Sequence, residues 1–221
     1  SINLLGVIQK VKQNQSKNFK GKTYKIPVYD NVKLLDEANL FSEWYAKKFV
    51  KKNKLIKFKA NLKKQIKFLL TKLNSKDKIF VHRDFHVSYL IRFKNKIGVI
   101  DTQDALIGNR AYDLASLIDD VRFKTHIKFK DKIYNHYRKL NKKRINKAVL
   151  LNDFEILSIL RNMKIIGIFT RLAIRDKKKQ YLKLIPYAWK LVELRISNNM
   201  KFSELKNLLD LNFSQKIRNQ K

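Results

Sequence analysis

Residues 78–122 contain the most informative pattern in the chain, KIFVHRDFHVSYLIRFKNKIGVIDTQDALIGNRAYDLASLIDDVR. The apolar run 79–81 predicts a buried strand that ends at the polar triplet His-Arg-Asp at 82–84. Two further strand-like runs within 90–100, joined by a Lys-Asn-Lys turn, predict a strand pair that ends at Asp101. Each predicted strand end therefore delivers a carboxylate. Two such carboxylates can lie on either side of a phosphate and a metal ion, so we expect them to form one site.

The triplet and the acid that follows it match the spacing of a kinase active site. In the loop H-R-D-x-x-x-x-N the Asp accepts the proton of the substrate hydroxyl, and a later Asp holds Mg²⁺. Asp84 is therefore the candidate general base, and Asp101 is the candidate Mg²⁺ ligand. Asp104 is a candidate for a contact with the surroundings of the metal or with the substrate. The alternative is that Asp84 caps a turn and that Asp101 only ends a strand.

Four other polar residues of this stretch have weaker assignments. His82 and Arg83 precede the candidate base and are candidates for a contact with the substrate or with the catalytic groups, although for His82 the favoured role is to fix the loop by a hydrogen bond to backbone. His86 either reaches the substrate or packs within the loop. Asp113 lies in the first turn of a predicted helix, where the positive end of the helix dipole favours a carboxylate. We therefore expect a structural role for Asp113.

Tyr89 stands where the kinase loop has its metal-binding Asn, five positions after Asp84, and Ser88 precedes it. A neutral phenol is a poor Mg²⁺ ligand, and a pKa near 10 keeps it neutral at pH 7. Either another oxygen compensates, for which Ser88 is the candidate, or catalysis is weakened or lost.

The motifs around these residues resemble a known family. A protein kinase has a long activation loop after its metal-binding Asp, whereas here a helix follows almost directly, at 110–117. This arrangement resembles the aminoglycoside phosphotransferase and choline kinase group of small-molecule kinases. The segments VHRDFHVSYL and GVIDTQDALIGNRAYDLASLIDD are most similar to bacterial sugar kinases that phosphorylate N-acetylmuramate and N-acetylglucosamine at the anomeric position. EANLFSEWY at 37–45 and RNMKIIGIFTRL at 161–172 fit the same subfamily.

The resemblance covers roughly residues 25–215, and the chain departs from the family pattern at Ser88, Tyr89, Thr102 and Asn109. It implies ATP-dependent phosphorylation of a small-molecule hydroxyl, with ATP as co-substrate and Mg²⁺ as cofactor. The implied partner is an amino sugar such as N-acetylmuramate or N-acetylglucosamine. The implied setting is peptidoglycan recycling in the cytoplasm, with no membrane partner and no specific nucleic acid.

The fold that the resemblance implies is α+β and mostly helical, the C-terminal lobe of a protein-kinase-like, aminoglycoside phosphotransferase fold. Kinases also have an N-terminal lobe with a Gly-rich loop and a Lys that contact the phosphates. This sequence has five glycines, scattered singly: Gly6, Gly21, Gly98, Gly108 and Gly167. We therefore expect residues 1–30 to be a post-hinge segment and loop, and residues 31–221 to be the C-lobe, either cut from a longer protein or encoded alone.

Helical periodicity dominates outside the central stretch. Asn152 or Asp153 is expected to cap the longest helix, and Gly167 within it indicates close packing. Trp44 and Trp189 are expected to be core residues. Gln13 to Lys25 is expected to be a loop, and helices are expected within 1–14, from 30 or 31 to 49, and at 55–73, 111–123, 127–140, 153–174, 181–196 and 202–211.

Composition narrows the alternatives. The 221 residues carry a net charge of +33 and no Cys, which excludes disulfides and thiolate metal sites. The high positive charge is typical of nucleic-acid-binding proteins, so one hypothesis is a basic nucleic-acid-binding helical protein. Its Lys residues, however, are spread over every segment, together with abundant Asn, Ile, Phe and Tyr, which is typical of an AT-rich genome. The first alternative to an active kinase is an inactive pseudokinase or truncated kinase lobe, and the nucleic-acid reading is the second.

Overall fold

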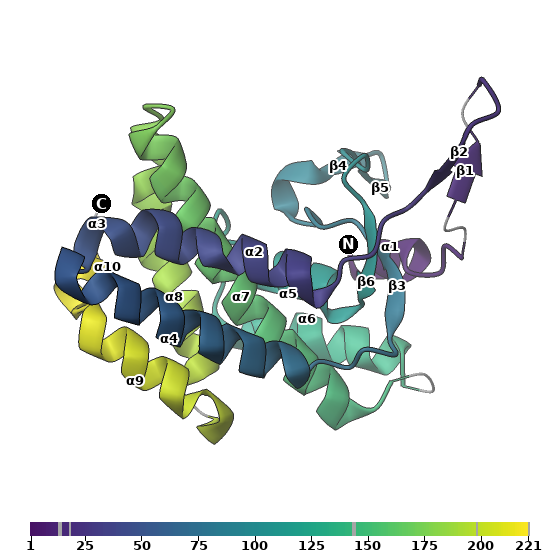
Figure 1. The fold of residues 1–221 in the computed structure, drawn as a ribbon. Coiled ribbons are helices and arrows are strands. Elements are labelled where there is room, and N and C mark those ends of the chain that lie inside the picture. Colours follow the sequence, from purple (N-terminus) through teal and green to yellow (C-terminus); the bar gives the residue numbers. More distant parts are fainter. Residues whose placement is uncertain (13–14, 18, 143–144, 198, 221) are drawn as a thin grey trace. The chain divides into compact units, whose positions relative to one another are not determined.

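The computed structural model describes residues 1–12, 15–17, 19–142, 145–197 and 199–220. The chain divides into two compact units. Figure 1 labels their helices and strands on the ribbon. The strand-bearing unit comprises Ser1–Asp30 and Asn74–Phe154, and the helical unit comprises Asn31–Leu73 and Glu155–Lys221. All described strands lie in the strand-bearing unit. The two candidate carboxylates at the predicted strand ends therefore belong to this unit.

The strands of the central stretch form two antiparallel pairs. β4 (Leu90–Phe93) pairs with β5 (Lys96–Val99), which confirms the predicted strand pair and its turn. β3 (Lys78–Val81) pairs with β6 (Leu106–Asn109), a strand that the sequence does not predict. The four residues of β6 have the sequence LIGN, and Gly and Asn are poor strand formers. Pairing with the apolar β3 supplies the hydrogen bonds that make this short segment a strand.

A further hairpin corrects the expected loop from Gln13 to Lys25. β1 (Gln15–Lys17) and β2 (Thr23–Lys25) pair antiparallel. Their polar residues give no alternating apolar pattern, so only the backbone pairing reveals them. Gly21 lies between the strands with φ +73°, a conformation that Gly adopts without steric cost. Residues 13, 14 and 18 lie outside the described part of the chain.

The helices of the strand-bearing unit agree with the prediction in place, with one change in length. α1 (Ile2–Ile8) and α6 (Ile127–Leu140) lie where helical spacing places them. α5 (Ala111–Ile118) ends earlier than residue 123. The Nζ of Lys130 lies 2.6 Å from the carbonyl oxygen of Ile118 and donates a hydrogen bond to it. A tertiary donor thus satisfies a carbonyl in the last turn of α5, which the local sequence does not show.

The longest helix begins earlier than expected. α7 (Lys147–Ile174) is preceded by Asn146, whose side-chain oxygen accepts hydrogen bonds from the N–H groups of Ala148 at 2.9 Å and Val149 at 3.2 Å. Asn146 is therefore the capping residue, and the prediction of Asn152 or Asp153 as the cap is wrong. Asp153 lies within the helix, where its carboxylate binds groups outside the helix.

The helical unit is built from α2 (Asn31–Leu40), α4 (Lys52–Thr71), most of α7 and the C-terminal helices, which begin with α8 (Ile185–Ile196). Figure 1 shows α2 and α4 side by side. α8 begins after residue 181 because Pro186 has no N–H and is tolerated only in the first turn of a helix. None of the described helices has the length and apolar character needed to cross a membrane. The other described elements of the unit are a π-helical segment (Phe41–Ala46), α3 (Lys47–Phe49), α9 (Ser203–Asn212), α10 (Gln215–Arg218) and two 3₁₀ helices (Lys179–Leu184 and Met200–Phe202).

The expected continuous helix from 31 to 49 is interrupted by its π-helical segment, which begins where Gly167 packs against it. A Cβ on Gly167 would lie 2.3 Å from the carbonyl carbon of Leu40 and 2.6 Å from the backbone nitrogen of Phe41. Such close contact between backbones is possible only for Gly. The close packing predicted for Gly167 is thus confirmed, and its partner is the junction between α2 and the π-helical segment.

Aromatic side chains form the core of the helical unit. Phe41, Tyr45, Trp189 and Phe213 are all at most 2% exposed, and their ring centroids lie 5.3–5.7 Å apart. Trp189 is a core residue, as expected. Trp44 is only half-buried and lines a pocket of about 530 Å³ instead, so its assignment to the core is wrong. Trp44 lies between Glu43 and Tyr45 in the π-helical segment. A π-helix has more residues per turn than an α-helix, so the α-helical spacing on which the prediction depends does not apply there.

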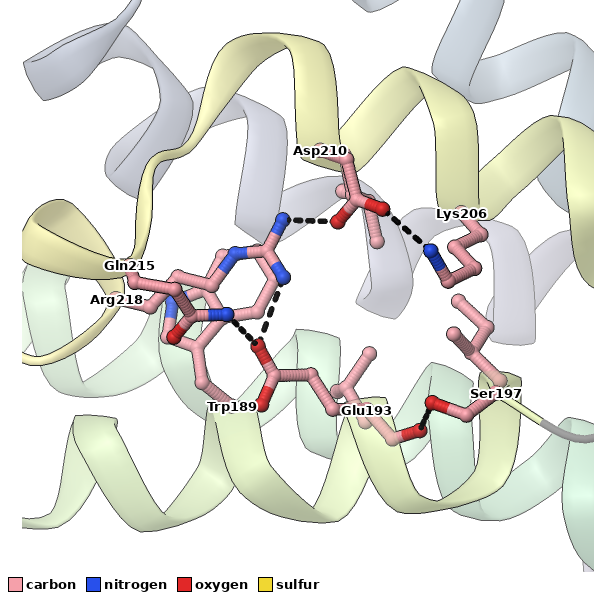
Figure 2. A pocket seen from close by; sticks show the side chains of 10 residues that line it. Trp189, Glu193, Ser197, Lys206, Asp210, Gln215 and Arg218 are labelled. Atoms are coloured by element: carbon pink, nitrogen blue, oxygen red, sulfur yellow. Dashed lines mark hydrogen bonds and ion pairs between the residues drawn. The ribbon is translucent and has the colours of Figure 1, made fainter.

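Arg218 connects the three C-terminal helices (Figure 2). Its guanidinium bonds Glu193 of α8 at 2.7 Å and Asp210 of α9 at 2.6 Å, and lies over the ring of Trp189. These groups line a pocket of about 310 Å³, whose charged side chains are already paired with one another. The short helix α10, which the sequence does not predict, is therefore held by tertiary ion pairs.

Candidate active site

Asp113 fixes the backbone of the loop that carries Asp84. The carboxylate of Asp113 accepts hydrogen bonds from the backbone N–H of His82 at 2.7 Å and of Arg83 at 3.0 Å. His82 and Asp113 are both 0% exposed, so these bonds are shielded from water. Hydrogen bonds to a buried carboxylate are among the stronger ones in proteins. The backbone just before the candidate base is therefore anchored to α5.

His82 ties this loop to the segment that carries Asp101. Its ring Nε2 lies 3.0 Å from the carbonyl oxygen of Ile100, so Nε2 carries the proton and donates it. Ile100 immediately precedes Asp101. The side chain of one residue thus connects the two segments on which the candidate carboxylates lie.

Both segments contain a non-glycine residue in the left-handed region. Arg83 has φ +74° and Asp101 has φ +70°. This conformation costs roughly 1–2 kcal/mol for an L-residue, and such residues cluster at functional sites. The Nη1 of Arg83 donates to the carbonyl oxygen of Asp104 at 3.3 Å, and its guanidinium lies over the ring of Tyr29. Arg83 therefore joins the two segments a second time.

The two candidate carboxylates have different surroundings. The side chain of Asp84 is 44% exposed, and one of its oxygens lies 4.0 Å from Nε2 of His86, which is almost fully buried. The carboxylate of Asp101 accepts a hydrogen bond from the side-chain amide of Gln103. Asp84 can thus face a solute, whereas Asp101 already has one neutral donor.

Tyr89 lies near both carboxylates. Burial, a hydrogen bond with Asp101 and the negative charges of Asp101 and Asp84 raise the pKa of the Tyr89 phenol, and the charge of Arg122 opposes them. The N–H of Ile100, the residue before Asp101, donates a hydrogen bond to the carbonyl oxygen of Tyr89 at 3.1 Å, so the backbone of Tyr89 lies beside the segment that carries Asp101. Ser88, the other departure from the kinase loop, is exposed.

Two contributors to this arrangement are not evident from the sequence. Gln103 and Arg122 act on Asp101 and Tyr89 respectively, and neither belongs to the H-R-D-x-x-x-x-N pattern. Gln103 stands only two residues after Asp101, and this short spacing is the one signal in the sequence that the two side chains can interact. For Arg122 the sequence offers several neighbouring acids as ion-pair partners and does not distinguish among them. The structure places it 3.6 Å from a carboxylate oxygen of Asp120.

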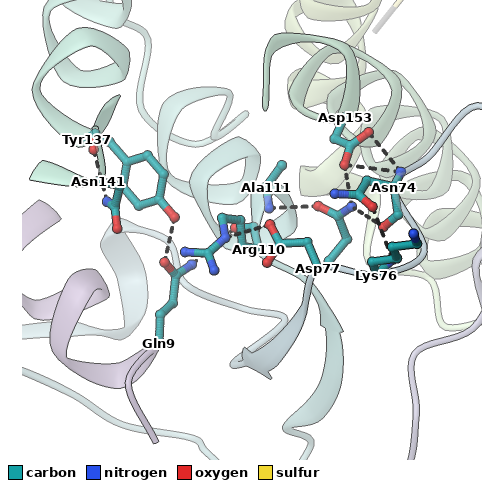
Figure 3. Close-up of polar contacts among 10 residues, drawn as sticks. Gln9, Asn74, Lys76, Asp77, Arg110, Ala111, Tyr137, Asn141 and Asp153 are labelled. Carbon is teal, nitrogen blue, oxygen red and sulfur yellow. Dashed lines mark hydrogen bonds and ion pairs between the residues drawn. The ribbon is translucent and has the colours of Figure 1, made fainter. Parts of the chain in front are cut away.

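A polar network supports the β3–β6 pair from the opposite end (Figure 3). Arg110, which follows β6, donates through Nε to Asp77, just before β3, at 2.6 Å. The phenol of Tyr137 donates to Gln9 at 2.6 Å, and the amide of Gln9 donates to the carbonyl oxygen of Arg110 at 3.1 Å. Helices α1 and α6 are thereby attached to the strands that carry the site.

The buried carboxylate of Asp153 completes this network. It accepts hydrogen bonds from the Asn109 side chain at 2.5 Å and from the backbone N–H of Asn74 at 3.2 Å. Asn109 is the last residue of β6, and Asn74 precedes β3. The departure from the family pattern at Asn109 therefore has a structural role, which is to join the end of β6 to α7.

The comparisons with known proteins agree with this geometry. A family model described as the phosphotransferase enzyme family matches residues 23–145, more than half of the chain, including the segments that carry Asp84, Asp101 and Asp113. The chain belongs to this phosphotransferase family.

Similar proteins in the family are sugar kinases. The chain is 33% identical, over 73% of its length, to an N-acetylmuramate/N-acetylglucosamine kinase of Neisseria meningitidis serogroup B, and covers 50% of that protein. It is 28% identical, over 83% of its length, to a Pseudomonas aeruginosa protein of the same name, and covers 56% of it. The chain therefore spans about half the length of the curated relatives that it matches.

A comparison with solved structures also matches this chain to about half of a larger kinase. The amicoumacin kinase hAmiN, solved in complex with AMP-PNP, Ca²⁺ and Ami, superposes with a TM-score of 0.55 at 14% identity. The match covers 87% of this chain and 56% of that kinase. The mostly helical α+β structure is thus that of a C-terminal kinase-like lobe, which confirms the fold class expected from the sequence.

Proposed function

We propose that this chain provides the catalytic lobe of an ATP-dependent phosphotransferase that acts on a hydroxyl of an amino sugar, such as N-acetylmuramate or N-acetylglucosamine. The observation that carries the proposal is the anchored loop, in which Asp113 holds the backbone of His82 and Arg83 and leaves Asp84 half-exposed. Membership of the phosphotransferase family and the names of the similar sugar kinases support the reaction and the substrate.

In this proposal Asp84 is the general base. Its carboxylate orients the sugar hydroxyl and accepts the hydroxyl proton as the oxygen forms its bond to the γ-phosphorus, while the bond from phosphorus to the ADP oxygen breaks. The buried ring of His86, 4.0 Å from the Asp84 carboxylate, limits the positions that this carboxylate can take. A half-exposed acid on a fixed backbone combines access with orientation, which is what a general base needs.

Asp101 is the residue that would hold Mg²⁺. Among the residues that the structure describes, no three His, Cys, Asp or Glu side chains gather into a metal-binding group. Mg²⁺ in kinases does not require one, because it is usually bound by one or two carboxylates together with the substrate phosphates. A single carboxylate at Asp101 fits this pattern. When bound, the ion neutralises charge that develops on the transferring phosphate.

We assign residues 1–30 to the segment after the inter-lobe hinge, and residues 31–221 to the C-lobe. The Gly-rich loop and strand Lys that contact phosphates in kinases have no counterpart in this sequence. In the proposed function these contacts come from an N-terminal lobe. The functional test therefore has to supply one.

The test joins this chain to the N-terminal half of the Neisseria relative and measures phosphate transfer from ATP to each sugar. We expect Asp84→Asn to lower the rate about 10²- to 10⁴-fold, because removal of the base leaves the shape of the loop intact. Asp36→Asn, which neutralises an exposed carboxylate of α2, is the matched control and should leave the rate unchanged. Equal rates for the two variants, or no transfer to either sugar, would contradict the proposal.

A second function, that of an inactive pseudokinase, is favoured by one observation. Tyr89 stands at the position of the metal-binding Asn and lacks the amide oxygen of that residue. If this replacement prevents catalysis, the fused protein should fold and bind nucleotide without transferring phosphate. Tyr89→Asn together with Ser88→Asp should then raise the rate. A fast wild type that the double substitution slows would contradict the pseudokinase function.

A further inference from the structure

The helical unit contains a pocket that has no part in the proposed phosphate transfer. Its volume is about 530 Å³, within the range of about 300–1,000 Å³ that is usual for small-molecule sites. All of its lining residues belong to the helical unit, where they come from α2, the π-helical segment, α3 and the end of α7. The lining residues are Leu40, Glu43, Trp44, Lys47, Lys48 and Ile174.

Three of the lining side chains are apolar and incompletely buried. Trp44 and Leu40 are half-buried, and Ile174 is 45% exposed. Apolar surface that stays in contact with water is available to an apolar ligand, because covering it is favourable. The indole N–H of Trp44 has no hydrogen-bond partner among the described residues, so it can donate to an acceptor on the same ligand.

The backbone that carries Trp44 is fixed on both sides. The next residue, Tyr45, is 2% exposed, and its phenol donates to the carbonyl oxygen of Ile217 at 3.1 Å. Gly167 packs against the backbone of Leu40, just before the π-helical segment. Short π-helical turns occur frequently at functional sites. A side chain on a fixed backbone loses little conformational entropy when a ligand binds, which favours binding.

The charges around the pocket are unbalanced. The carboxylate of Glu43 is paired with Lys59 at 2.8 Å. Lys47 makes no hydrogen bond or ion pair within the described part of the chain. The Nζ of Lys48 lies 5.0 Å from the centroid of the Phe49 ring, and none of the described carboxylates pairs with it. Two ammonium groups therefore lie at the pocket without an acid to neutralise them.

We propose that this pocket binds a small organic anion in which an apolar ring or chain carries a carboxylate. The apolar part covers Trp44, Leu40 and Ile174, and the carboxylate meets the ammonium groups of Lys47 and Lys48. A neutral molecule of the same shape gains only the apolar contact and binds more weakly. Binding involves the helical unit alone and is independent of phosphate transfer.

The test uses three probes that share one phenyl ring and differ in charge: phenylbutyrate, phenylbutyramide and phenylbutylamine. Each is titrated into the 221-residue chain while tryptophan fluorescence is recorded. The chain has two tryptophans, and Trp189 is 1% exposed, so Trp44 is the one that reports a ligand in the pocket. We expect phenylbutyrate to bind with a dissociation constant on the order of millimolar, the affinity usual for so small a ligand.

The charge preference is the decisive result. We expect phenylbutyrate to bind about 3- to 10-fold more tightly than the amide, and the amine to bind most weakly. In about 1 M NaCl the preference should shrink, because salt screens charges at a surface.

Two double variants remove the same net charge at different places. Lys47→Gln with Lys48→Gln should abolish the preference for the acid. Lys63→Gln with Lys64→Gln, at exposed lysines of α4 that do not line the pocket, is the matched control and should keep it. Trp44→Phe should lose the fluorescence change, and circular dichroism shows that each variant is folded.

Three results would overturn the inference. The first is equal binding of the acid and the amide, or no fluorescence change with any probe. The second is an equal loss of preference in both double variants, which would show that the net charge alone attracts the acid. The third is an unchanged fluorescence response in Trp44→Phe, which would place the probe elsewhere. None of these results bears on the proposed phosphate transfer.

Discussion

The carboxylate of Asp113 shows how much a single residue contributes to the geometry of the site. Both of its oxygens accept backbone N–H groups of the loop before Asp84. The sequence indicates only that an acid in the first turn of α5 is structural. It does not indicate that the acid serves a loop distant in sequence, because helix-dipole arguments concern the helix itself.

Asp113→Asn should therefore destabilise the protein although it preserves shape. The amide has one oxygen, so one of the two buried N–H groups faces an NH₂ and loses its acceptor. We expect a loss of about 1–3 kcal/mol in the free energy of unfolding, the cost of an unsatisfied buried donor. Urea unfolding measures it. Asp104→Asn, at an exposed side chain in the same region, is the control, and a change of equal size there would contradict the assignment.

At the residue scale, the sequence predicts the identities of the chemical groups better than their contacts. Asp84 and Asp101 are recognisable because proton acceptance and metal binding require carboxylates at a characteristic spacing. The contact between Tyr89 and the segment that carries Asp101 depends on a short turn and on a backbone hydrogen bond from Ile100. No local pattern encodes such a contact, because it joins two segments whose approach is set by the β4–β5 hairpin.

At the scale of elements, helices with clear apolar periodicity are predictable, and elements defined by tertiary partners are not. α6 matches its predicted range because its sequence alone specifies it. The strand β6 exists through its pairing with β3, and α10 through the ion pairs of Arg218. The π-helical segment likewise depends on a partner, the glycine at position 167 of α7.

Two glycines in helices make the effect of such a partner measurable. Gly167→Ala improves helix propensity by about 1 kcal/mol but places a Cβ against the backbone of Leu40, and overpacking costs about 1–3 kcal/mol. We expect net destabilisation. Gly6→Ala in α1 meets no atom within 4 Å and should stabilise by up to about 1 kcal/mol. Thermal unfolding should thus give shifts of opposite sign. Stabilisation by Gly167→Ala would mean that the close approach to Leu40 is absent.

At the scale of the whole molecule, the family and the mostly helical fold follow from the order of the motifs, since the H-R-D triplet, the later Asp and the following helix occur together in this group of kinases. The division into two units does not follow from it. The strand-bearing unit takes its first residues from the N-terminus and the rest from 74–154, so its parts are separated by α2 and α4. Sequence proximity is a poor guide to such an arrangement.

The two units each contain a deeply buried tyrosine, which makes global stability sensitive to alkaline pH. Burial raises the pKa of Tyr45, in the helical unit, and of Tyr137, in the strand-bearing unit, to about 12. The folded state therefore keeps these protons at a pH where the unfolded chain, with a tyrosine pKa near 10, releases them. Their contribution to stability is fully present below pH 10 and is lost as the pH rises from about 10 towards 12.

Tyr45→Phe tests this sign. The phenol of Tyr45 donates to the carbonyl oxygen of Ile217 at 3.1 Å, so the substitution costs about 1 kcal/mol at pH 8 by loss of that bond. It also removes one ionisable group from the unfolded chain. The stability of the variant should therefore fall less than that of wild type between pH 9 and pH 11, by about 1 kcal/mol at the top of that range. Lysine deprotonation is common to both proteins and cancels in the difference. Parallel pH profiles in urea unfolding would show that Tyr45 ionises as readily in the folded protein as in the unfolded chain, and the aromatic core of the helical unit would then have to admit water.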